Sequence, residues 1–270
     1  MSAGTLTVLL VGDIVGRAGR FALGRALRQI VQRHRIDFVV ANGENAAAGM
    51  GLTPTVAIEL FDAGVDVLTS GNHIWGKKEM IPFLEGERRV LRPANYPDPA
   101  PGRGSGVFTS ISGVKVGVLN LEGRVFMNAL DCPFLAADRE IGRLSEETKI
   151  ILADFHAETT SEKMALGYYL DGRVSVLAGT HTHVQTADER ILPQGSAYIT
   201  DLGMTGGWDG VIGFQKEKPL QRFLTQRPVR FEPACRQLIL NGLVAEIDIE
   251  TGRALRIERV FEHVPGEVTG

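Results

Sequence analysis

Short apolar runs alternate with helical patterns over the first 85 residues, and this alternation most constrains the fold. The runs are almost continuously apolar and lie at residues 5–11, 38–41 and 65–69. Such runs are typical of parallel strands that are buried on both faces. Helical spacing or helix-start residues occupy the segments between and after them, at residues 21–33, 53–63 and 77–85. This order predicts a parallel sheet covered by helices.

The rest of the chain predicts a second group of strands. Ser112 and Gly113 separate two β-rich runs, which suits a hairpin with a tight turn. Strands are expected at residues 107–111, 114–121, 149–155, 174–178, 197–200, 237–249 and 254–263, and helices at 134–147 and 161–170. We therefore expect an α/β fold in which two mixed β-sheets pack together and are flanked by helices. Residues 1–270 are expected to form a single domain.

Composition excludes several classes of protein. The chain has 29 Lys and Arg against 32 Asp and Glu, a net charge of −3, whereas proteins that coat nucleic acids are normally basic. No stable nucleic-acid binding is expected. No apolar run reaches the roughly 20 residues that cross a bilayer, and no signal peptide is expected at the N-terminus. The two cysteines, Cys132 and Cys235, are too few for a disulfide framework, so we expect free thiols in a cytoplasmic protein.

Polar residues that carry chemistry stand where the expected strands end. Ligands bind outside the carboxyl ends of the strands in an open parallel sheet, so these residues are expected to meet at one edge. We call them the strand-end set: Asp13, Glu44, Asn45, Asn72, His73, His156, His181 and His183.

The chemistry of this set points to metal ions. Carboxylates, amides and imidazoles suit Zn, Mn, Fe or Co, and the set is larger than the three or so ligands of one catalytic ion. Two ions about 3.5–4 Å apart, bridged by one carboxylate, would use all of it. His181 and His183 would point to the same side of an extended segment. The glycines beside these positions, among them Gly12 and Gly71, allow tight turns.

Each residue also has a simpler interpretation. Asp13 alone could cap a turn, Asn45 and Asn72 are common turn formers, and a lone histidine is more often structural. The metal hypothesis rests on the whole set. Other signals are weaker: residues 12–19 lack the order of a dinucleotide-binding loop, and residues 205–210 are expected to form a flexible surface turn that could cover a substrate base.

The series Gly12-Asp13, Gly43-Glu44-Asn45, Gly71-Asn72-His73, His156 and Gly179-Thr180-His181-Thr182-His183 resembles the motifs of the calcineurin-like metallophosphoesterases. Two positions depart from the usual pattern. Val15 stands where that superfamily usually has a metal-binding histidine, and Glu44 stands where it usually has a bridging aspartate. With Asn45, these departures are similar to the YmdB-like bacterial branch, whose described activity is hydrolysis of cyclic nucleotides, notably 2′,3′-cyclic ones.

The resemblance implies a four-layer sandwich and a dinuclear metal-dependent phosphodiesterase that uses a metal-bound hydroxide. By position, Asp13, Glu44, His183 and Asn45 would hold one ion. Glu44, Asn72, His156 and His181 would hold the other, with Glu44 as the bridge. His73 would contact the phosphate and protonate or stabilise the leaving oxygen. Fe or Mn ions, or Zn, are expected as cofactors, with a small cyclic nucleotide as substrate.

Other functions remain open at this stage. A phosphomonoesterase of the same superfamily would share these motifs. A regulatory nucleotide- or phosphate-binding protein that keeps the metal site but turns over little gains weight from Val15. The final hairpin, residues 237–263, could complete a sheet or build the interface of a homo-oligomer.

Overall fold

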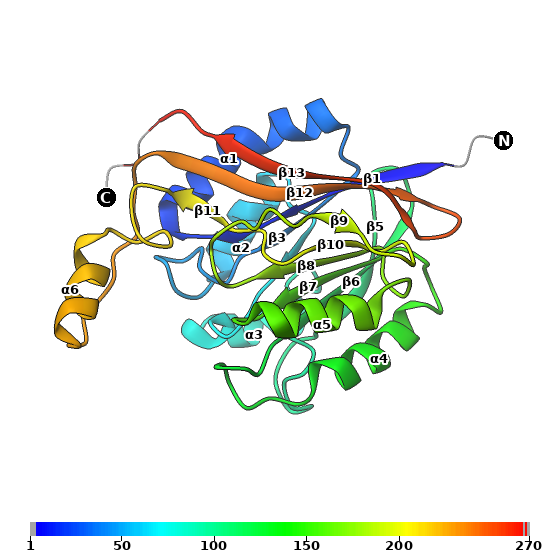
Figure 1. Ribbon diagram of the computed structural model, residues 1–270, viewed down its shortest axis with the longest axis horizontal. Coiled ribbons are helices and arrows are strands. Elements are labelled where there is room, and N and C mark those ends of the chain that lie inside the picture. The colour runs from blue at the N-terminus through cyan, green and yellow to red at the C-terminus, as the bar shows by residue number, and fades with distance from the viewer. Residues whose placement is uncertain (1–3, 267, 269–270) are drawn as a thin grey trace.

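The computed structural model describes residues 4–266 and 268, which form two mixed β-sheets with helices on both outer faces (Figure 1). The first sheet has seven strands: β1 (Thr5–Val11), β2 (Asp13–Ile14), β3 (Phe38–Asn42), β4 (Val67–Thr69), β11 (Met204–Gly207), β12 (Leu238–Asp248) and β13 (Ala254–His263). The second has six: β5 (Ser105–Thr109), β6 (Lys115–Glu122), β7 (Ile151–His156), β8 (Val176–Thr180), β9 (Arg190–Ile191) and β10 (Ala197–Ile199). The helices are α1 (Gly16–His34), α2 (Pro54–Asp62), the 3-10 turn η1 (Ile74–Gly76), α3 (Met80–Gly86), α4 (Pro133–Leu144), α5 (Thr160–Leu170) and α6 (Glu217–Thr225).

Both sheets combine parallel and antiparallel strands. In the first sheet β1, β3 and β4 are parallel neighbours, and β12 pairs antiparallel with β1 on one side and β13 on the other. In the second sheet β6, β7, β8 and β10 are parallel, with β5 and β9 antiparallel at the edges. The final hairpin therefore completes the first sheet. The carboxyl ends of β1, β3, β4, β7 and β8 carry the strand-end set.

Side-chain alternation along the strands builds the layers. In β1, Leu6, Val8 and Leu10 face the second sheet, whereas Leu9 and Val11 pack against the helices on the outer face. A third apolar core joins the second sheet to α4 and α5. The resulting order, helix layer, sheet, sheet, helix layer, is visible in Figure 1 with α1 at the top and α4 at the bottom. The expected fold of two packed mixed sheets flanked by helices is confirmed.

The first helix starts earlier than its apolar spacing predicts. The apolar spacing predicts a helix from residue 21, but α1 begins at Gly16 and includes Gly19. Gly16 has a φ of +58°, which turns the chain from β2 into the helix. A Cβ on Gly19 would lie 2.4 Å from the carbonyl oxygen of Thr205, so this glycine lets α1 pack directly on β11.

Residues 205–210 differ most from the sequence expectation. Residues 205–207 are not a surface turn but belong to β11, a buried strand that pairs parallel with β2 and antiparallel with β12. Two of the four residues in β11 are glycines, which carry no apolar side chain that would mark a strand. Trp208 follows at the surface. Helix α6 was also not predicted; it projects from the body of the molecule (Figure 1) and exposes Phe223 and Leu224.

Smaller points of the sequence analysis are met. The two cysteines are free thiols. No helix among the described residues has both the length and the apolar character needed to cross a bilayer.

Candidate metal centre

The strand-end set comes together at one edge of the two sheets. The first sheet provides Asp13 in β2 and, in the loops after β3 and β4, Glu44, Asn45, Asn72 and His73. The second sheet provides His156 as the last residue of β7, and His181 and His183 in the loop after β8. The site is therefore built at the junction of the sheets, and each sheet contributes part of it.

One group of donor atoms is centred on His156. Its Nε2 lies 3.1 Å from Glu44 Oε1, 3.1 Å from Asn72 Oδ1 and 3.0 Å from His181 Nδ1. Donor atoms of Glu44, His156 and His181 all lie within 4.8 Å of one another, which is close enough to hold one metal ion. We call Glu44, Asn72, His156 and His181 the His156 group. They are the four residues that the resemblance assigns to one ion.

A second group lies beside it and shares Glu44. His183 Nε2 lies 3.2 Å from Asn45 Nδ2 and 3.7 Å from Asp13 Oδ1. Asn45 Nδ2 also lies 3.2 Å from Glu44 Oε1, so Glu44 borders both groups. Asp13 is fully buried, yet its Oδ1 has no hydrogen-bond partner among the described residues. A buried carboxylate oxygen without a donor is costly, and a cation would satisfy it.

In each of His156, His181 and His183, the ring nitrogen that points away from the two groups faces a hydrogen-bond acceptor. His156 Nδ1 lies 2.9 Å from Thr180 Oγ1; because the Thr180 hydroxyl donates to Asp154 Oδ1 at 2.7 Å, it accepts from His156. His181 Nε2 lies 3.2 Å from Glu158 Oε2, and His183 Nδ1 donates to the carbonyl oxygen of Ile212 at 2.8 Å. These partners leave the inner nitrogens, which face the two groups, free to bind metal, as in known metal sites.

The charges of the site are balanced by a proton on His156. Burial alone would lower the pKa of His156, but the carboxylates of Glu44 and Asp13 raise it to about 9. Burial alone would raise the pKa of Glu44, but the charge and hydrogen bond of His156 lower it to about 2. Burial raises the pKa of Asp13 to about 6, despite His183 and His156 nearby. The buried carboxylates therefore hold a positive charge where a metal ion would sit.

His181 behaves in the opposite way. Burial and the neighbouring charge of His156 lower the pKa of His181 to about 3, so its imidazole is uncharged at neutral pH. A neutral imidazole is the form that binds metal. The donor set, the orphaned oxygen of Asp13 and the oriented histidines together fit two transition-metal ions.

His73 sits at the rim of the site with its side chain 31% exposed. Its backbone N–H donates to Glu44 Oε2 at 2.9 Å, and its Nδ1 lies 2.8 Å from Asn45 Oδ1. Since an amide oxygen accepts only, the proton on His73 resides on Nδ1 and Nε2 is the nitrogen available for proton transfer. Burial lowers the pKa of His73 below its usual value, although Glu44 opposes this.

The loop that carries His181 and His183 is not the extended segment that the sequence predicted. Both residues have positive φ angles, 100° and 65°, so the segment turns after β8 and alternation does not explain its geometry. A buried ion pair holds it instead. Asp201 Oδ2 accepts from Lys163 Nζ at 2.6 Å and from the backbone N–H of Thr182 at 3.1 Å. Lys163 on α5 is fully buried, which fixes this pair.

Gly71 and Val15, which the sequence analysis singled out, each have a clear structural role. A Cβ on Gly71 would lie 2.1 Å from the ring of His156, so only glycine lets the loop after β4 pass this close. Val15, at the position of the usual histidine, is buried against Met204 and Ile239. Asn45 lies next to His183 and Glu44, but it presents its Nδ2 to them, so binding a cation through its oxygen requires the amide to turn over.

Sequence reasoning missed the residues that orient the histidines. Asp154 lies in the apolar run of β7, two positions before His156, and accepts from Thr69, Thr180 and Asn42. A charged residue inside such a run, at the spacing that puts it on the same face as His156, was a usable signal. Glu158 and Asp201 gave no comparable pattern.

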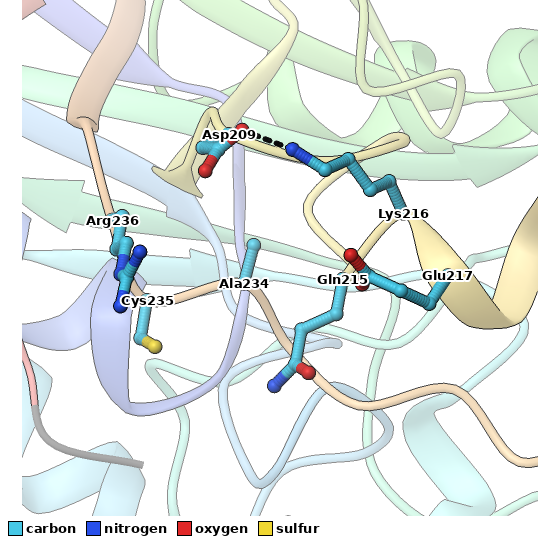
Figure 2. A pocket seen from close by; sticks show the side chains of 7 residues that line it. All are labelled: Asp209, Gln215, Lys216, Glu217, Ala234, Cys235 and Arg236. Atoms are coloured by element: carbon cyan, nitrogen blue, oxygen red, sulfur yellow. Dashed lines mark hydrogen bonds and ion pairs between the residues drawn. The ribbon is translucent and has the colours of Figure 1, made fainter.

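Another cavity, of about 310 Å³, lies between the end of β11, the start of α6 and the segment before β12 (Figure 2). Its lining is mainly polar, and Figure 2 shows the ion pair between Asp209 Oδ1 and Lys216 Nζ, 3.3 Å apart. No residue of the strand-end set lines it. This cavity is therefore separate from the candidate metal centre.

Known proteins share this architecture over nearly the whole chain. A 2′,3′-cyclic-nucleotide 2′-phosphodiesterase of Bacillus subtilis (strain 168) is 46% identical over 256 residues, 95% of this chain and 97% of that protein. A novel phosphatase from Mycoplasma pneumoniae, known from its crystal structure, is 34% identical in sequence. Its structure matches with a TM-score of 0.90 over 97% of this chain and 95% of that one. A hypothetical protein from Thermus thermophilus is 43% identical, with a TM-score of 0.88 over 96% of this chain and 100% of that one.

The model of the family described as YmdB-like protein matches residues 9–260. This range includes every member of the strand-end set. The resemblance to the YmdB-like branch of the metallophosphoesterases, based on five short motifs, is thereby confirmed. The chain belongs to the YmdB-like protein family.

Proposed function

We propose that the protein is a dinuclear metal-dependent phosphodiesterase that hydrolyses 2′,3′-cyclic nucleotides. The observation that carries this proposal is the shared position of Glu44 between the His156 group and the pair Asp13 and His183. The substrate class is supported by the 46% identical relative, whose name is 2′,3′-cyclic-nucleotide 2′-phosphodiesterase. We further propose that residues 1–270 form one catalytic domain, since strands of both sheets share one core.

The chain's own donor atoms divide into two ligand sets. Asp13, Asn45, His183 and Glu44 would hold one ion; Glu44, Asn72, His156 and His181 would hold the other. When bound, the two ions neutralise the charge of the phosphodiester and acidify water, so that attack at phosphorus is feasible near neutral pH. The mixed nitrogen and oxygen donors favour Fe or Mn, with Zn also compatible.

We assign to His73 the transfer of a proton to the leaving oxygen. Asn45 contacts Nδ1 of His73, and the partly exposed ring leaves Nε2 for the substrate side. An anionic phosphate close to Nε2 favours its protonation, and the protonated ring then donates to the departing alkoxide. Asn45 contacts the ring at Nδ1 and Glu44 accepts from the backbone N–H of His73, so neither blocks Nε2.

The experiment is hydrolysis of 2′,3′-cyclic AMP by protein stripped with a chelator and then resupplied with Mn or Fe. Turnover should return with metal, and it should fall by at least about 10²-fold in Glu44→Gln, which removes the shared carboxylate. Glu147→Gln, an exposed carboxylate that pairs with Lys115 at the start of β6, is the matched control and should keep full activity. Protein that binds two ions but hydrolyses no cyclic nucleotide would overturn the proposal.

The phosphomonoesterase alternative is tested with the same preparation. 4-Nitrophenyl phosphate and bis(4-nitrophenyl) phosphate differ in whether the phosphate carries one ester or two. A phosphodiesterase should cleave the diester at the higher kcat/KM. A preference for the monoester would move the assignment to the phosphatase class, which the name of the Mycoplasma relative also covers.

A further inference from the structure

A larger cavity of about 410 Å³ adjoins the candidate metal centre, and neither the metal ligands nor His73 explain it. It is bounded by β11, β12, β13 and the loops that carry His183 and Ile212. His183 belongs to both sites: its Nε2 faces Asp13 and Asn45, whereas its Nδ1 donates to the carbonyl oxygen of Ile212 on the cavity wall. The volume is in the range of small-ligand sites, about 300–1,000 Å³.

One residue of the cavity lining carries an unsatisfied polar group. Asn241 of β12 is 2% exposed, and its side-chain Oδ1 has no hydrogen-bond partner among the described residues. The backbone carbonyl of Asn241 accepts from the N–H of Gly12 at 3.0 Å, so this residue lies directly beside the turn that carries Asp13. A buried amide oxygen without a donor is unfavourable, so a hydrogen-bond donor on a ligand would stabilise it.

The mouth of the cavity is aromatic. Trp208 and Phe261 are 51% and 45% exposed, and their rings meet edge to face with centroids 5.7 Å apart. Arg259 lines the same cavity and pairs with Glu189 at 2.8 Å. Exposed aromatic faces beside a buried polar group are typical of sites where bases of nucleotides stack.

Resting on the proposed function, we propose that this cavity is the nucleobase subsite of the enzyme. The cyclic phosphate would lie at the metal centre, His183 would stand between the two parts of the substrate, and the base would stack on Trp208. Asn241 Oδ1 would accept a hydrogen bond from the exocyclic amine of adenine or cytosine. Trp208 and Asn241 are specificity-determining residues in this arrangement.

The first test is binding of adenosine, which has the base but no phosphate. The chain has two tryptophans, so Trp75→Phe leaves Trp208 as the only tryptophan. Adenosine should quench its fluorescence in a saturable way, without added metal. The affinity should fall about tenfold when Asn241→Leu removes the amide at nearly constant size, and a folded Asn241→Leu protein with unchanged affinity would contradict the role of the amide.

The second test separates the base from the phosphodiester. Trp208→Ala should raise KM for 2′,3′-cyclic AMP about tenfold, the usual loss for one base stacked on an aromatic ring. The same variant should leave KM for glycerol 1,2-cyclic phosphate, which has the cyclic phosphodiester but no base, unchanged. Phe223→Ala on α6 is the matched control: it removes an exposed aromatic ring outside this cavity and should change neither KM.

The outcomes distinguish the subsite from the activity. If the wild type hydrolyses neither substrate with any metal, the proposed function fails, and saturable quenching by adenosine would still support the cavity as a nucleoside site. If both substrates are hydrolysed but Trp208→Ala changes them equally or not at all, the subsite is overturned and the phosphodiesterase stands. Absence of saturable quenching by adenosine also overturns the subsite.

Discussion

At the scale of single residues, hydrogen bonds outside the metal centre decide which nitrogen of each histidine can bind a cation. The clearest case is the chain from Asp154 through Thr180 to His156, with contacts of 2.7 Å and 2.9 Å. Because the hydroxyl has one proton and gives it to the carboxylate, it accepts from Nδ1 and leaves Nε2 for the metal. A single hydroxyl thus sets the tautomer of a buried candidate ligand.

We expect Thr180→Val to weaken metal binding by about 10–100-fold, the usual cost of losing such an outer partner. Valine keeps the shape of threonine but cannot accept from His156 Nδ1, so the ring loses its orientation. Titration of Mn into the metal-free protein measures the effect. Thr159→Val is the matched control, because the Thr159 hydroxyl has no partner among the described residues and its removal should leave affinity unchanged. Equal affinities for Thr180→Val and the wild type would refute the argument.

The strand-end set was predictable because parallel strands deliver their carboxyl ends to one edge. The positions of Asp13, Glu44 and His156 followed from that rule alone. The partners of the histidines were not predictable in the same way. Glu158 and Asp201 act through loop geometry, and the positive φ of His181 has no sequence signal such as glycine. Contacts between loops depend on the tertiary fold, which local patterns do not contain.

At the scale of elements, the contact between α1 and β11 depends on Gly19, which precedes the helix start that the apolar spacing predicts. A Cβ on Gly19 would meet the backbone of β11, whereas a Cβ on Gly24 in the same helix would meet nothing within 4 Å. Periodicity identifies the apolar face of a helix but not how closely its backbone approaches a neighbour. The start of α1 was missed for this reason, and β11 was missed because two of its four residues are glycines.

The two glycines make a matched pair for a stability measurement. Gly24→Ala should raise the free energy of unfolding by about 0.5–1 kcal/mol, because alanine loses less backbone entropy in a helix. Gly19→Ala should lower it by about 1–3 kcal/mol, because the helix or the strand must move to relieve the overlap. Urea denaturation of both variants gives the comparison. Stabilisation by Gly19→Ala would show that α1 does not need this close approach to β11.

At the scale of the whole molecule, the candidate metal centre lies where the two sheets, which share an apolar core, both contribute side chains. Asp13 and Glu44 come from the first sheet, and His156 and His181 come from the second. In the metal-free protein, the proton on His156 holds the carboxylates of the first sheet against the second. We therefore expect a bound metal ion and this proton to compete for the same position, so that stability depends on both.

This competition predicts how stability depends on pH. The pKa of His156 is about 9 in the folded protein and about 6.5 in an unfolded chain, so the folded state binds more protons between these values. The stability that His156 provides is complete below pH 6.5 and is lost as pH rises to 9, by up to about 3 kcal/mol. The pKa values of His73 and His181 are lowered, so these two residues affect stability only below pH 6.5. They do not change how stability depends on pH between 6.5 and 9.

Metal should reverse the trend, because a cation needs the neutral form of His156 and displaces its proton. Urea denaturation of metal-free protein between pH 6.5 and 9 should show falling stability. The same series with saturating Mn should show a stabilisation by metal that grows with pH, since fewer protons then compete for the site. Metal-free protein whose stability rises over this interval would show that the buried carboxylates do not hold a proton on His156. A metal-induced stabilisation independent of pH would show that the cation binds without displacing that proton, and hence away from His156.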